Sequence, residues 1–120
     1  MTNRRITLVV NRQSQLAWRR ADVLFVDSLP RLHDAVAAHD IERIVLDRCA
    51  SADEYLDLLA SLPSEVAGDV LNVRDDGGAF LSSIGRGGDR VLYALAPHDV
   101  HFYLETHGLT ANREPLARIA

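Results

Sequence analysis

The chain has 120 residues, of which 48% are apolar and 25% are charged, and this is the size and composition of one globular domain. Its net charge is −4, from 13 basic and 17 acidic residues, so nucleic acid and anionic membranes are not expected partners. The single cysteine, Cys49, excludes an internal disulfide, and no apolar run approaches the roughly 20 residues that a membrane span needs. Because no signal peptide is visible at the first residues, we expect a cytoplasmic protein.

The first elements alternate between apolar runs and helix-like segments. Residues 6–10 form a continuous β-branched run, which predicts a buried strand, and residues 13–20 have room for a short helix. A second strand is predicted at 23–26. The helix expected at 30–39 begins with Pro30, whose missing N–H costs nothing in the first turn.

The middle of the chain continues this alternation. Residues 41–46 predict a third strand, and Ser51 and Glu54 have the spacing of a capping box at the start of a helix that stops at Pro63. A fourth strand is expected at 70–73. The segment 79–84 is interpreted as a short helix.

The last third contains two glycine-rich turns, at 75–78 and 85–88, a fifth strand at 91–95 and a helix at 99–107. Gly108 is a natural stop for that helix. Strand–helix alternation repeated five times predicts an α/β domain with a parallel sheet and helices on both faces. We expect this domain to cover residues 1–109, followed by a linker or the start of a further element at 110–120.

The order of these elements resembles the receiver domains of the response-regulator family. The segment from Val23 to Pro63 is the closest match, and the segment from Asp89 to Leu109 resembles the last strand, the following proline and the last helix of a receiver. In this register Asp47, which ends the run Ile44-Val45-Leu46, falls on the phosphoacceptor position. The resemblance implies a flavodoxin-like three-layer sandwich, with a five-stranded parallel sheet between helices.

Most of the residues that receivers use for phosphorylation are missing. Receivers hold Mg²⁺ with acidic residues after the first strand, where this chain has Asn11 and Arg12. They have Ser or Thr at the end of the fourth strand, where this chain has Asn72-Val73-Arg74, and Lys before the proline, where it has Ala96. The resemblance therefore implies a degenerate receiver, or pseudo-receiver, without a cofactor; Mg²⁺ would be needed only if Asp47 were phosphorylated.

We therefore expect a non-catalytic signalling module that acts through protein–protein contacts in a two-component or cyclic-dinucleotide pathway. The expected partner is a signalling protein, a neighbouring domain or a second copy in a homodimer, with no nucleic acid and no membrane. The face that mediates pairing in the receiver family suggests four interface candidates, namely Tyr93, His101, Phe102 and Leu104.

No enzyme and no metal site are expected. The chain has no Gly-x-Ser-x-Gly elbow, and Ser82 and Ser83 have no evident base partner. Three histidines lie near Glu105, but their spacing matches no strong metal-binding motif, so a solvated helix face is the better interpretation. These histidines are His98, His101 and His107.

Two alternatives stay open. In the first, Asp47 is an atypical phosphoacceptor, with Arg12 or Arg74 in place of the receiver lysine; the competing interpretation is that Asp47 caps the next helix or pairs with an arginine at the strand end. The second alternative is a STAS-like antagonist module, because the segment 100–109 ends in the Leu-x-x-x-Gly-Leu pattern of that family's closing helix. The run 45–48 lacks the Asp-Ser-Ser/Ala-Gly that would follow in that family.

Overall fold

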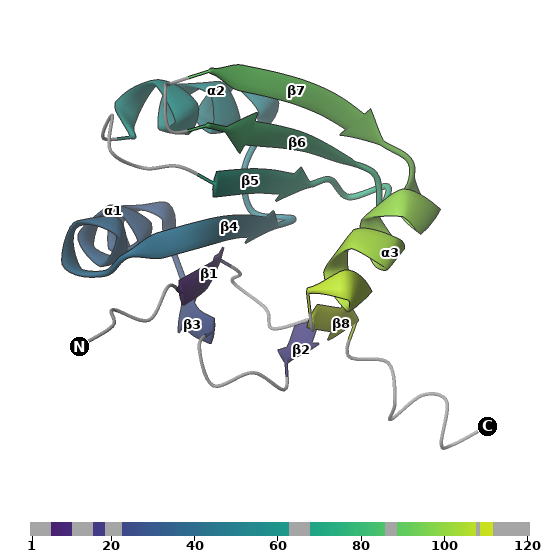
Figure 1. Cartoon of the computed structure of the whole chain (residues 1–120), viewed down its shortest axis with the longest axis horizontal. Helices are drawn as coiled ribbons and strands as arrows, with labels where there is room; N and C mark the ends of the chain where they lie inside the picture. Colours follow the sequence, from purple (N-terminus) through teal and green to yellow (C-terminus); the bar gives the residue numbers. More distant parts are fainter. Residues whose placement is uncertain are drawn as a thin grey trace.

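A computed structural model of the whole chain describes residues 6–10, 16–18, 23–62, 68–85, 89–107 and 109–111. The strands are β1 (Ile6–Val10), β2 (Leu16–Trp18), β3 (Val23–Val26), β4 (Ile41–Asp47), β5 (Gly68–Val73), β6 (Ala79–Ile84), β7 (Arg90–Leu95) and β8 (Leu109–Ala111). The helices are α1 (Leu29–Ala38), α2 (Ala52–Ser61) and α3 (Pro97–Thr106) (Figure 1).

The main sheet is mixed, so the predicted flavodoxin-like five-stranded parallel sheet is wrong. Its six strands have the order β3-β1-β4-β5-β6-β7. The first four of these pair in parallel, whereas β5, β6 and β7 form an antiparallel meander. A second, two-stranded sheet pairs β2 with β8.

The error arises in the segment 79–84, which is strand β6 and not the expected helix. The turn before it is tight: the amide of Gly77, at φ +92°, donates to the Arg74 carbonyl at 3.0 Å, and the amide of Arg74 donates to the Gly78 carbonyl at 2.7 Å. The side chain of Asp76 accepts a further bond from the Gly78 amide at 2.9 Å. An Asp-Gly turn of this kind joins antiparallel neighbours, so no crossover helix is needed.

The helix expected at 13–20 is also absent from the described part of that segment, which is strand β2 at Leu16–Trp18. Residues 13–15 and 19–20 lie outside the described residues, as do Asn11, Arg12, Pro63, Gly108 and residues 86–88 of the second glycine-rich turn. Strand β8 spans Leu109–Ala111 and so continues two residues past the expected domain boundary at residue 109.

The other expected elements are confirmed to within a few residues, and α2 begins as its sequence predicts. The Ser51 hydroxyl accepts a hydrogen bond from the Glu54 amide at 3.1 Å, and the Glu54 carboxylate accepts one from the Ser51 amide at 2.8 Å. This capping box satisfies two backbone donors and fixes where the helix starts.

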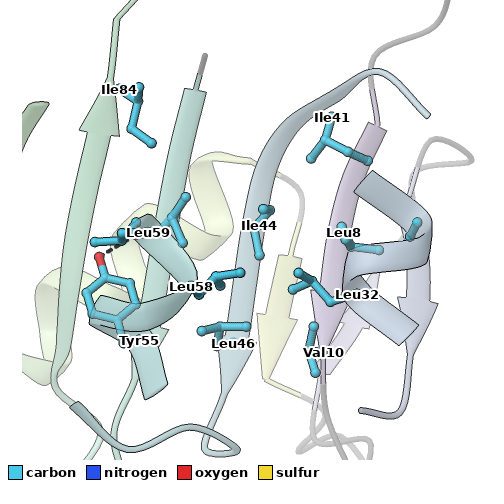
Figure 2. Close-up of a cluster of buried hydrophobic side chains, with 12 residues drawn as sticks. Leu8, Val10, Leu32, Ile41, Ile44, Leu46, Tyr55, Leu58, Leu59 and Ile84 are labelled. Carbon is cyan, nitrogen blue, oxygen red and sulfur yellow. Dashed lines mark hydrogen bonds between the residues drawn. The ribbon is translucent and has the colours of Figure 1, made fainter. Parts of the chain in front are cut away.

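Helices α1 and α2 pack on one face of the sheet and α3 packs on the other. Under α1 and α2 lies the larger core, and in it the Tyr55 hydroxyl donates to the Val70 carbonyl at 2.9 Å (Figure 2). The smaller core lies between α3 and the sheet and consists of Val9, Val45, Leu71, Val73, Ala79, Val100 and Leu104. Because successive residues of a strand face opposite sides, each residue of the central strands can be assigned to one of these two faces.

Candidate functional site

Asp47, the predicted phosphoacceptor, lies at the end of β4 and is buried, with 2% of its surface exposed. Its Oδ1 atom accepts a hydrogen bond from Nη1 of Arg48 at 2.9 Å, and the two side chains form an ion pair. Arg48 has φ +57°, a left-handed conformation that is uncommon for a residue with a side chain. This backbone conformation accompanies the ion pair between the Arg48 side chain and that of Asp47, the residue before it.

This environment favours the structural interpretation of Asp47 over the phosphoacceptor interpretation. Its carboxylate is largely screened from solvent, and burial raises the pKa of Asp47, an effect that the charge of Arg48 only partly opposes. Arg74, one of the two proposed substitutes for the receiver lysine, stacks over the Phe80 ring at 5.4 Å; Arg12, the other, lies outside the described residues.

The raised pKa of Asp47 predicts how stability depends on pH. Since the folded state holds this proton more tightly than the unfolded state, the wild type loses stability relative to Asp47→Asn as the pH rises above the ordinary carboxyl pKa of 3.8. The loss levels off once the pH exceeds the folded-state pKa. Urea unfolding of both proteins from pH 3 to pH 7 measures the difference. A wild type that gains stability relative to the variant over this range would show that Arg48 dominates and lowers the pKa.

A cavity of about 650 Å³ opens beside this strand end, on the face covered by α2. It lies between the start of α2 and the β5–β6 turn, and its lining includes Arg48, Ser51, Asn72, Arg74 and Phe80. Asn72 is 1% exposed, and its Oδ1 atom has no hydrogen-bond partner among the described residues. A buried polar atom without a partner is costly and rare, so it marks the cavity as more than a packing defect.

The cavity was not predicted from the sequence, although Asn72 itself gives a signal. It is a polar residue in the apolar run Val70-Leu71-Asn72-Val73, near the end of the fourth strand that the sequence predicts. The sequence interpretation used this position only to note that a receiver hydroxyl is missing. The sequence prediction did not include the β5–β6 hairpin, whose turn forms the opposite wall.

Strand β7 forms an edge of the main sheet and exposes apolar side chains on both of its faces. Val91 and Tyr93 are 50% and 47% exposed on the side of α3, and Leu92 is 57% exposed on the side of α1 and α2. Figure 1 shows β7 as the outermost strand, with β6 on its inner side. Within the described part of the chain, no strand pairs with its outer edge.

The structure separates the four predicted interface residues. Tyr93 is on β7, whereas His101 and Phe102 are exposed on α3, which begins where β7 ends and runs towards β8 (Figure 1). His101 pairs with Glu105 one turn further on at 3.3 Å. Leu104 is buried in the smaller core, so its side chain is unavailable for a surface contact.

A polar network fixes α3 to the sheet. The Tyr103 hydroxyl donates to Oδ2 of Asp69 at 2.6 Å and accepts from Nε of Arg43 at 2.9 Å. Arg43 also donates to the Thr7 hydroxyl at 3.2 Å. Burial and the bond to Asp69 both raise the pKa of Tyr103, so the hydroxyl remains a donor at all physiological pH values. The network therefore joins α3 to three neighbouring strands, β1, β4 and β5.

In the described segments, no group of three or more His, Cys, Asp and Glu side chains is placed to hold a metal ion. None of the described helices combines the length and the apolar character that crossing a lipid bilayer requires. Comparison of the chain with protein-family models, with curated proteins and with solved structures finds no match.

Proposed function

We propose that the chain is a non-catalytic regulatory module that acts through protein–protein contacts, and that β7 is the strand through which it docks. One observation supports this proposal above all others: an edge strand exposes apolar side chains on both of its faces. The two-component or cyclic-dinucleotide pathway, the cytoplasmic location and the receiver resemblance stay predictions of the sequence.

Edge strands usually contain features that prevent pairing with other chains, such as prolines, lysines or bulges. Strand β7 has the sequence Arg-Val-Leu-Tyr-Ala-Leu, with none of these residues, and it pairs with β6 in an unbroken register. Its outer edge presents a row of backbone N–H and C=O groups to which an extended segment can bond. The strand therefore has both the hydrogen-bonding groups and the apolar surface that strand addition uses.

The occupant that this edge fits best is a second copy of the chain. A two-fold contact needs a surface that is complementary to itself, and two antiparallel β7 strands meet this condition. Residues 91–95 have no charge, and Arg90 donates to the Leu59 carbonyl at 2.9 Å, which draws its guanidinium towards α2. Pairing around the two-fold axis then covers Val91, Leu92 and Tyr93 and brings no like charges into contact within residues 91–95.

The test is the association state of the wild type and of Leu92→Lys, measured by analytical ultracentrifugation over a range of concentrations. A lysine in the edge is expected to weaken the dimer about a hundredfold, because the two-fold axis makes each substitution act twice and each loses apolar burial. Leu56→Lys is the matched control, since Leu56 is exposed to a similar extent, at 54%, but lies on α2.

Dimerisation of the wild type and of Leu56→Lys, together with a monomeric Leu92→Lys, supports the proposal. A wild type that stays monomeric at high concentration overturns the choice of a second copy as the occupant. Equal weakening by both lysine substitutions would mean that the contact involves another surface.

A further inference from the structure

The side-chain oxygen of Asn72 is the strongest unexplained feature of the fold. It is an acceptor with no partner in the part of the chain that the structure describes, and the residue lines the cavity at the start of α2. Leaving this oxygen unpaired destabilises the folded state, because it has lost its bond to water without gaining another. A ligand that supplies an N–H or O–H donor would remove that cost.

The surroundings of Asn72 indicate the rest of the ligand. Arg74 lines the cavity and has a ring contact with Phe80, but no ion pair with any described carboxylate. The positive charge of Arg48, by contrast, is offset by Asp47. Arg74 is therefore the cation in this cavity that is available to an anionic group.

The start of α2 adds to the attraction for an anion. Its capping box uses the Glu54 amide, while no hydrogen bond to the amides of Ala52 and Asp53 is formed by the described residues. Free amides at a helix start, with the positive end of the helix dipole, favour negative charge, part of which Asp53 and Glu54 in the first turn already supply. Two carboxylates, those of Asp75 and Asp76, also line the opposite wall, and Asp76 accepts the Gly78 amide through Oδ1. Their charges repel an anion but attract a ligand's N–H donor, so the lining favours a ligand that has both kinds of group.

We propose that this cavity binds a small-molecule anion that also has an N–H donor, with the donor on Asn72 and the anionic group between Arg74 and the start of α2. The volume of about 650 Å³ lies within the range of small-molecule sites. Two sources share this chemistry: a nucleotide, with a base amino group and a phosphate, and an α-amino acid, with an ammonium group and a carboxylate.

The test titrates adenosine monophosphate and, separately, L-glutamine into the ¹⁵N-labelled full chain and follows its backbone and side-chain amides by NMR. We expect one of the two probes to shift the Asn72 side-chain amide and the Ala52 and Asp53 backbone amides in a saturable way. Asn72→Leu and Arg74→Gln should each weaken this binding about tenfold or more, the loss expected from one charge-assisted or buried hydrogen bond. Arg31→Gln, an exposed change on α1, is the control and should bind like the wild type.

The melting temperature of Asn72→Leu is a second readout. It should change in one direction if Asn72 serves a ligand and in the other if Asn72 serves only to stabilise the fold. Without ligand, Asn72→Leu should melt at a higher temperature than the wild type, because it removes the unpaired oxygen; an asparagine that stabilises the fold would give a lower one. The inference is overturned if neither probe binds, if Asn72→Leu binds as well as the wild type, or if Asn72→Leu lowers the melting temperature. Since Arg74 is exposed, Arg74→Gln keeps the test valid even if Asn72→Leu fails to fold. The same two probes are also titrated into Leu92→Lys, which is expected to be monomeric. Binding by this variant would show that the cavity does not depend on the β7 contact.

Discussion

Replacing Gly68 by alanine is expected to lower the free energy of unfolding by about 4 kcal/mol, the sum of backbone strain and steric overlap. Gly68 begins β5 at φ +146°, a conformation that side chains rarely adopt. A Cβ atom there would lie 2.1 Å from the Glu42 carbonyl oxygen, which belongs to the neighbouring strand β4. The backbone cannot yield without breaking the pairing of two central strands.

Urea unfolding monitored by circular dichroism measures this effect. Gly85→Ala is the matched control, because its Cβ would lie 3.8 Å from the nearest atom, in ordinary contact, and its φ is not positive. That variant is expected to differ from the wild type by less than about 0.5 kcal/mol, as for an ordinary surface change. A Gly68→Ala protein as stable as the control would mean that β5 does not begin as described.

The second large effect is expected from Tyr103→Phe, which removes one hydroxyl and leaves the ring in place. The hydroxyl joins Arg43 to Asp69, and its bond to the carboxylate is only 2.6 Å long. Losing a hydrogen bond to a charged group costs about 2 kcal/mol. The change takes one bond from the partly buried Asp69 and one from the buried Arg43, which keeps its bonds to Thr7 and Glu42. Because this network fixes α3 to the sheet, the amides of α3 should also exchange with solvent faster than in the wild type.

Tyr93→Phe provides the comparison, since it removes the hydroxyl of an exposed tyrosine on β7. Measured at concentrations where the protein is monomeric, it should leave both stability and α3 exchange unchanged. If the two variants behaved alike, the Arg43–Tyr103–Asp69 network would contribute little, and the packing of Val100 and Leu104 would be enough to keep α3 in place.

Periodicity and capping predicted the individual elements well, because apolar runs and caps are local properties of the sequence. The pairing of strands is not local. The segment Ala79-Phe80-Leu81-Ser82-Ser83-Ile84 is short enough to suit either a helix or a strand. The Asp76-Gly77 turn decides the matter, since it returns the chain beside β5. Giving that turn more weight would have predicted the antiparallel half of the sheet.

The candidate sites were predictable to different degrees. Asp47 at the end of a buried run was visible in the sequence, and so was an arginine as its partner at the strand end. That the partner is Arg48, the next residue, depends on the left-handed φ of Arg48. Asn72 lies on β5, and its side chain is enclosed where β5, the start of α2 and the β5–β6 turn meet. A sequence alone does not show which buried polar atoms lack partners in such a place.

The claim that β7 pairs with a second copy is tested most directly by amide hydrogen exchange of residues 91–95 at a concentration where the wild type is dimeric. In a free edge strand, alternate amides point away from β6 and exchange quickly, as they should in monomeric Leu92→Lys. Strand pairing across the two-fold axis predicts that all five amides are protected in the wild type. A dimeric wild type that keeps the alternating pattern would contradict pairing through β7.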